Sequence, residues 1–120
     1  MIKQMVPTLI YLEDHQIQHR DIKPENLMLK YKDDISFVKL GDFGLSRDTS
    51  KVNSYNCEYG STPCFMAPEE SHNKGCCKSD VWSLGVTMFY ILCGKYPFTG
   101  KSSLQILCKT FTEEIDFGGL

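Results

Sequence analysis

Apolar and polar residues along the chain follow patterns that predict three helices and one β-hairpin. Met5, Leu9 and Leu12 recur at the spacing of one helix face, which predicts an amphipathic helix within residues 1–16. Pro7 falls inside this pattern, and its missing N–H is harmless only in the first turn of a helix. The helix is therefore expected to start nearer residue 6 than residue 2.

Two short apolar runs, residues 27–29 and 35–40, flank the charged stretch KYKDD and predict a small hairpin. Residues 45–64 are rich in Ser, Thr, Asn and Tyr and show no period. A segment of that length without regular structure is uncommon inside a compact domain, and it is usually a functional loop or disordered.

The stretch SDVWSLGVTMFYILCG predicts a helix over about residues 79–93, with Ser79 or Asp80 as its cap and Gly94 at its end. Nearly every position between them is apolar, a pattern typical of a buried helix. We therefore expect this helix to form the centre of the fold. The side chains expected to be largely buried are Trp82, Val86, Phe89 and Leu92. Residues 102–111 show weaker helical periodicity, so the expected fold is mainly α with a small β-hairpin.

Composition adds mainly exclusions. The 120 residues are 42% hydrophobic and 23% charged with a net charge of −2, as expected for one soluble globular domain. No basic run exceeds two residues and no apolar run approaches a membrane span, so neither a nucleic-acid nor a membrane partner is expected. The six cysteines include no Cys-x2-Cys pair, and no signal peptide is recognisable. These observations favour reduced thiols over disulfides or zinc, and a cytoplasmic or nuclear protein.

Polar chemistry is concentrated in the stretch HRDIKPEN, residues 19–26, which lies between apolar segments. It is followed in order by GDFG, APE and DVWSLG. Together these stretches resemble the catalytic half of eukaryotic protein kinases, over roughly residues 1–110. The resemblance implies a kinase large lobe, with the catalytic loop at residues 19–26 and the activation segment at residues 42–69.

The same resemblance assigns the chemical roles, with ATP and Mg²⁺ as cofactors. Asp21 would accept or orient the proton of the substrate hydroxyl, and Lys23 would place a charge near the transferred phosphoryl group. Asn26 and Asp42 would supply the oxygen ligands of magnesium. Lys23, Asn26 and Asp42 thereby also contact the nucleotide. Two further residues are assigned to cofactor binding: Met28, beneath the adenine, and Glu25.

The activation segment leaves two alignments open, because YGSTPCFMAPE is one residue longer than the usual form of this stretch. If Thr62 and Pro63 align with the family, Thr62 bonds to Asp21 and Lys23, and Glu58 falls near the usual phosphothreonine. If Gly60 and Ser61 align instead, both assignments shift by one residue. The first alignment is preferred, and Glu58 is read as an exposed loop acid in preference to a phosphate mimic.

The remaining assignments by resemblance are regulatory or structural. Arg20 would hold a phosphate on the activation loop, and Phe43 and Gly44 of the DFG turn are regulatory. His19 would be a buried ring bonded to backbone near that turn. Glu69 of APE would pair with an arginine of a later helix. Asp80 would brace the backbone of the catalytic loop.

The predicted function is a protein serine/threonine kinase, since DIKPEN resembles the serine/threonine pattern, with a protein substrate. The hairpin and LCGKYPF look most like the calcium/calmodulin-dependent group. No G-x-G-x-x-G occurs, and the only arginines are Arg20 and Arg47, so we expect a partial kinase domain over residues 1–120, truncated at both ends and inactive alone. Its uncovered surfaces would favour aggregation or a chaperone as partner. A non-catalytic kinase-like binding module and a small-molecule kinase of the aminoglycoside type are the alternatives.

Overall fold

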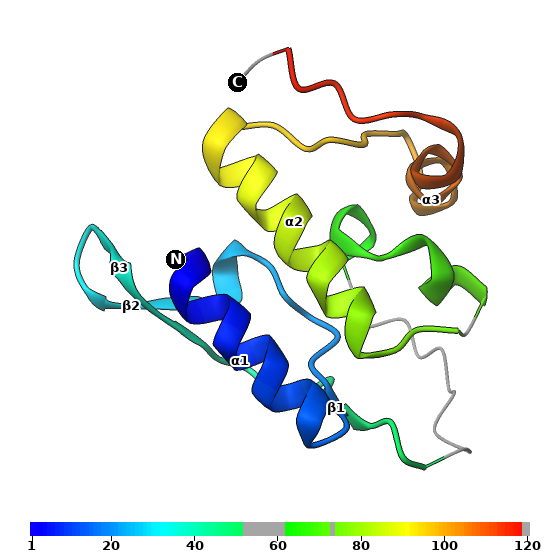
Figure 1. Ribbon diagram of the computed structural model, residues 1–120. Coiled ribbons are helices and arrows are strands. Elements are labelled where there is room, and N and C mark those ends of the chain that lie inside the picture. The colour runs from blue at the N-terminus through cyan, green and yellow to red at the C-terminus, as the bar shows by residue number, and fades with distance from the viewer. Residues whose placement is uncertain (52–61, 73, 119–120) are drawn as a thin grey trace.

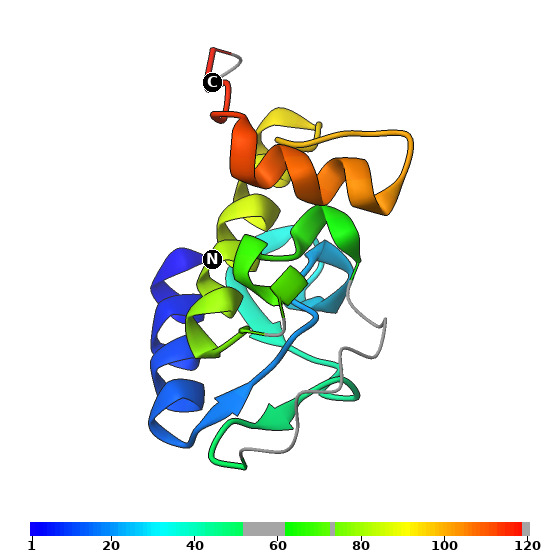
Figure 2. The same cartoon turned by 90° about the vertical axis from the view of Figure 1, so that its right-hand side faces the viewer.

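The computed structural model describes residues 1–51, 62–72 and 74–118 of the chain. The central helix α2 (Cys77–Cys93) lies between two groups of elements (Figures 1 and 2). On one side are helix α1 (Ile2–Asp14) and two small strand pairs. On the other side are the 3-10 helices η2 (Pro63–Phe65) and η3 (Pro68–His72), and helix α3 (Ser103–Thr112). The predicted class, mainly α with a small hairpin, agrees with this arrangement.

Helix α1 confirms the amphipathic prediction but begins earlier than expected. Met5, Leu9 and Leu12 are buried on one face, while Pro7 lies inside the helix on the exposed side. The expected start near residue 6 is wrong because Pro7 removes only one backbone hydrogen bond, to a carbonyl on the solvent side. The buried apolar face stabilises the helical turns before and after Pro7.

Two antiparallel strand pairs flank the stretch HRDIKPEN. The predicted hairpin is confirmed as β2 (Leu27–Tyr31) and β3 (Asp34–Leu40), with Leu27 opposite Leu40. A second pair, β1 (Ile17–Gln18) with β4 (Arg47–Asp48), was not predicted because each strand has only two residues. Between β1 and β2, residues 24–26 form the short 3-10 helix η1 (Pro24–Asn26).

Helix α2 begins two residues before the predicted position. Cys76 is its N-cap, so the prediction of Ser79 or Asp80 as the cap is wrong. Ser79 instead closes a capping box, in which its hydroxyl accepts the Cys76 N–H at 3.1 Å. Gly94 ends the helix as predicted, with φ of 68° and its N–H donating to the Tyr90 carbonyl.

Burial along α2 is one-sided. Val86 and Phe89 are 3% and 7% exposed, as predicted, and Trp82 is half-buried. Leu92 is 65% exposed, which contradicts its predicted burial. It shares an exposed stripe with Val81, since residues 11 apart return to the same side of a helix. Although α2 is apolar on every side, neighbouring elements therefore bury only part of its surface.

One apolar core joins the N-terminal half to α2. It combines side chains from α1, the stretch HRDIKPEN, β3 and α2, namely Met5, Leu9, Leu12, Ile22, Val38 and Leu84. The five cysteines of the described residues are free thiols. None of the helices in the described ranges is long and apolar enough to cross a membrane.

Candidate active site

The stretch HRD is anchored to α2 by one buried carboxylate. Asp80 is 2% exposed, and its two oxygens accept the backbone N–H groups of His19 at 2.7 Å and Arg20 at 3.0 Å. Burial raises the pKa of Asp80, and these two backbone hydrogen bonds oppose that rise. Asp80 therefore contacts the backbone where the family resemblance places a brace for the loop.

His19 connects this loop to the DFG turn. The ring is fully buried; its Nδ1 accepts the Asp21 N–H at 3.2 Å, so its Nε2 donates to the Gly41 carbonyl at 2.9 Å. The ring of Phe43 meets that of His19 edge to face, with centroids 4.7 Å apart. The expected backbone-bonded position of His19 near the DFG turn is what the structure shows.

Two residues of the site adopt a backbone conformation that is uncommon outside glycine. Arg20 has φ of 71° and Asp42 has φ of 53°. Such residues persist where surrounding contacts hold them, and they are frequent at functional sites. For Arg20 the holding contact is its N–H bond to Asp80.

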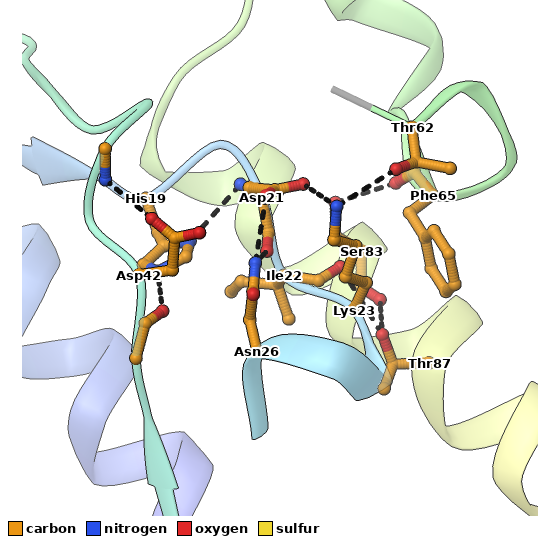
Figure 3. A network of polar contacts seen from close by, with 12 residues as sticks. His19, Asp21, Ile22, Lys23, Asn26, Asp42, Thr62, Phe65, Ser83 and Thr87 are labelled. Atoms are coloured by element: carbon orange, nitrogen blue, oxygen red, sulfur yellow. Dashed lines mark hydrogen bonds and ion pairs between the residues drawn. The ribbon is translucent and has the colours of Figure 1, made fainter. Parts of the chain in front are cut away.

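The side chains of Asp21, Lys23, Asn26 and Thr62 form one connected group (Figure 3). Lys23 Nζ lies 3.1 Å from Oδ1 of Asp21 and donates to the Thr62 hydroxyl at 3.3 Å. Asn26 Nδ2 donates to the backbone carbonyl of Asp21 at 2.7 Å and to its Oδ2 at 2.9 Å. Each carboxylate oxygen of Asp21 thus has its own donor, which fixes the orientation of the carboxylate. The contact between Lys23 and Thr62 favours the alignment through Thr62 and Pro63.

Asp42 lies on the other side of Asp21 from Thr62 in Figure 3. Its side chain is exposed, and Oδ1 accepts the Gly44 N–H at 3.2 Å. Within the described residues no three His, Cys, Asp or Glu side chains are grouped as a metal site. Since the amide nitrogen of Asn26 is used by Asp21, its oxygen is the atom suited to a hard cation, together with the Asp42 carboxylate.

A small depression, with no interior space large enough for a water molecule, lies beside Asp21. It is lined by Arg20, Asp21, Ile22, Thr62, Phe65, Met66, Glu70 and Ser83. Residues 20–22 form one side of it, and η2 with the residues that follow forms the other. An acceptor group at the mouth of this depression would be adjacent to Asp21.

Other predicted residues lie farther from this group or are placed differently. Met28 is 54% exposed on β2, where it packs on Gly41 so closely that a Cβ there would lie 2.7 Å from the Met28 methyl. Glu25 is exposed, and Glu58 lies outside the described residues. Glu69 accepts a hydrogen bond from the Ser79 hydroxyl at 2.7 Å, where the resemblance led us to expect an arginine.

Two residues that the sequence reasoning missed lie at the site: Glu70 lines the depression, and Gln18 contacts Glu70 from behind it. Gln18 is fully buried, and its Nε2 donates to Oε1 of Glu70 at 3.0 Å. Burial raises the pKa of Glu70, with Asp80 and Glu69 adding to the rise, while the Ala67 N–H bond and Arg20 oppose it. The sequence offered one signal for this pair: Gln18, a polar residue, directly precedes His19, which was expected to be buried.

Comparison with known proteins decides the family. Residues 1–117 match the protein kinase domain. The chain belongs to the protein kinase family. The chain is 39% identical over 110 residues to MAP kinase-activated protein kinase 2 of Cricetulus longicaudatus, an alignment covering 88% of this chain and 32% of that protein. It is 35% identical over 119 residues to calcium/calmodulin-dependent protein kinase type 1 of Caenorhabditis briggsae, covering 98% and 33%.

A third relative is protein lin-2 of Caenorhabditis elegans, 37% identical over 119 residues, covering 98% of this chain and 12% of that protein. The chain therefore spans about a third or less of the relatives that it matches. The kinase resemblance carried by HRD, DFG, APE and DVWSLG is confirmed, and relatives named as calcium/calmodulin-dependent kinases agree with the group that the hairpin suggested.

Proposed function

We propose that this chain supplies the catalytic loop of a protein serine/threonine kinase. In the whole protein, the γ-phosphate of ATP would be transferred to a serine or threonine hydroxyl of a protein substrate. The observation that carries the proposal is the connected group of Asp21, Lys23, Asn26 and Thr62. The proposal also includes the boundaries of the catalytic loop, residues 19–26, of the activation segment, residues 42–69, and of a large-lobe domain over residues 1–120.

Asp21 is the group that would receive the proton of the acceptor hydroxyl. As the O–H bond breaks, the hydroxyl oxygen forms a bond to the γ-phosphorus, and the bond from phosphorus to the β-phosphate oxygen breaks to release ADP. Lys23 and Asn26 hold the two oxygens of Asp21, so the carboxylate needs little reorganisation. A positioned base of this kind contributes about 10²–10⁴-fold to the rate.

The residues present also suit magnesium. The amide oxygen of Asn26 and the carboxylate of Asp42 are hard oxygen donors, and Mg²⁺ is commonly held by one or two carboxylates together with phosphate oxygens. The bound ion would neutralise phosphate charge as the phosphoryl group moves. Asp42 is exposed, so its carboxylate is accessible to a nucleotide-bound ion.

Lys23 is the residue on which the proposed specificity for serine and threonine over tyrosine rests. Its ammonium group contacts both Asp21 and Thr62, so it is at the place where an acceptor hydroxyl would meet the phosphate. The sequence around it, DIKPEN, resembles the serine/threonine pattern.

The 120 residues by themselves are proposed neither to bind ATP tightly nor to transfer phosphate. Met28, the expected floor beneath the adenine, is 54% exposed, so a nucleotide resting there would remain in contact with water. Charge contacts in that high dielectric contribute little affinity. Apolar side chains exposed on the hairpin and on α2, including Ile35 and Leu92, favour aggregation or a chaperone as partner. We also propose a cytoplasmic or nuclear location, with neither membrane nor nucleic acid as partner.

A chimera tests the enzymatic proposal. Residues 1–117 would replace the matching third of Caenorhabditis elegans calcium/calmodulin-dependent protein kinase type 1, which is 35% identical over 119 residues. Radiolabel from ATP is expected on serine or threonine of a peptide substrate. A chimera that binds Mg-ATP without transferring phosphate would favour the non-catalytic binding module, and label on tyrosine would contradict the assigned specificity.

Calorimetric titration of the isolated chain with Mg-ATP tests the second part of the proposal. We expect no heat of binding at micromolar nucleotide. A dissociation constant in the micromolar range, with label transfer to a protein substrate, would show that the isolated chain binds ATP and transfers phosphate, which would contradict this part of the proposal.

A further inference from the structure

A polar pair outside the proposed chemistry, in which Gln18 is buried and Glu70 half-buried, joins β1 to η3. Gln18 is 0% exposed, and its Nε2 donates to Oε1 of Glu70 across 52 positions of the sequence. In the described part of the chain no donor reaches the buried Oε1 of Gln18. A buried amide whose oxygen has no hydrogen-bond donor is less favourable than an apolar side chain of similar size. Packing alone therefore does not account for Gln18.

Glu70 is held from three directions. Its Oε2 accepts the Ala67 N–H at 3.0 Å within its own turn, and its Oε1 accepts from Gln18. The backbone of Gly75 closes the third side, since a Cβ at Gly75 would lie only 2.8 Å from Cγ of Glu70. Arg47 is paired with Gln18 in the β1–β4 register and donates to the Gly75 carbonyl. The pairing of β1 with β4 thus places both Gln18, which donates to Glu70, and Arg47, which holds the Gly75 backbone beside Glu70.

Each end of the pair continues directly into the candidate active site. Gln18 is followed by His19, whose N–H is bonded to Asp80. Glu70 is bonded to Ala67, which directly follows Met66 in the wall of the depression. A displacement at the pair would therefore move the wall relative to the catalytic loop.

We propose that Gln18 and Glu70 form a positioning pair, whose hydrogen bond sets the place of the depression wall formed by Phe65 and Met66 relative to Asp21. The proposal deepens the proposed function and rests on it, because the place of this wall affects the reaction only if the acceptor enters beside Asp21. The pair itself does not touch the reacting atoms.

Hydrogen exchange of the full chain at neutral pH, read by mass spectrometry, tests the pair. Gln18→Leu removes the donor, and Gly75→Ala keeps every polar group but pushes its Cβ against Glu70. Each is expected to raise exchange of residues 62–70 about tenfold, the equivalent of one lost hydrogen bond. Helix α1 is the internal reference and should change by less than about twofold; Glu114→Gln, at an exposed acid, is the control variant.

The double variant Gln18→Leu with Glu70→Leu separates positioning from packing. Two apolar partners should recover part of the urea midpoint that Gln18→Leu lowers, because neither member of the pair is then left without the other, although the Ala67 N–H loses its acceptor. Exchange at Ala67 should nevertheless remain fast, because its acceptor Glu70 is gone.

Three results would overturn the proposal: unchanged exchange of residues 62–70 in both single variants, an equal rise in α1, or full recovery of both midpoint and protection in the double variant. None of these measurements reads phosphate transfer. An inactive chimera would therefore refute the proposed function and leave this test to decide on the pair.

Discussion

Replacing Asp80 by alanine should detach the catalytic loop from α2. The change leaves the N–H groups of His19 and Arg20 without the acceptors that now lie at 2.7 and 3.0 Å. Hydrogen bonds to a charged group contribute about 1.5–3 kcal/mol each, so their loss amounts to about 3–6 kcal/mol. Burial of the carboxylate, which raises its pKa, offsets part of this. A net loss near the lower end, about 3 kcal/mol, is the expected result.

Urea unfolding followed by circular dichroism measures this loss. With a denaturant slope of about 1–3 kcal/mol per molar urea, the midpoint should fall by about 1–3 M. The control is Glu114→Ala at an exposed acid, for which a change within about 0.5 kcal/mol is expected. If Asp80→Ala also unfolds within about 0.5 kcal/mol of the wild type, the two backbone hydrogen bonds do not anchor the loop.

Two further predictions concern the core and the buried acids. Phe89→Ala should lower the unfolding free energy by about 3–5 kcal/mol, because the ring is only 7% exposed. Leu92→Ala, at a side chain that is 65% exposed, should lower it by about 1 kcal/mol or less. Equal losses of unfolding free energy in urea would contradict the one-sided burial of α2. Burial raises the pKa of Glu70 above its ordinary value of 4.5, so the folded state binds this proton more tightly than the unfolded state. The stability that this raised pKa contributes is complete below about pH 4.5 and is lost as pH rises through the folded pKa. The unfolding free energy of the wild type should therefore rise relative to that of Glu70→Gln as pH falls from neutral toward 4.5. Parallel curves of unfolding free energy against pH would contradict this prediction.

Local patterns predicted the elements whose signal lies within one segment. The apolar spacing of α1, the two apolar runs of the hairpin and the Gly94 stop of α2 each depend on neighbouring residues, and each was predicted correctly. The same local reasoning misplaced the start of α1, because whether Pro7 is tolerated depends on which side of the helix is buried. It misjudged Leu92 because cover on α2 depends on the neighbouring elements.

The contacts that assemble the site lie beyond local reasoning. The residues of the connected group were identified from the resemblance, and the contact between Lys23 and Thr62 was expected only under one of two alignments. The pair of Gln18 and Glu70 was missed because its partners are 52 positions apart and neither residue type suggests the other. Only the pairing of β1 with β4 and the close approach of Gly75 bring these groups together.

The most direct test of the central claim compares Asp21→Asn with the unchanged sequence in the chimera. If Asp21 receives the proton of the acceptor hydroxyl, turnover should fall about 10²–10⁴-fold. The affinity for Mg-ATP should change little, because the proposed metal ligands, Asn26 and Asp42, are retained. Undiminished turnover in Asp21→Asn would contradict the account.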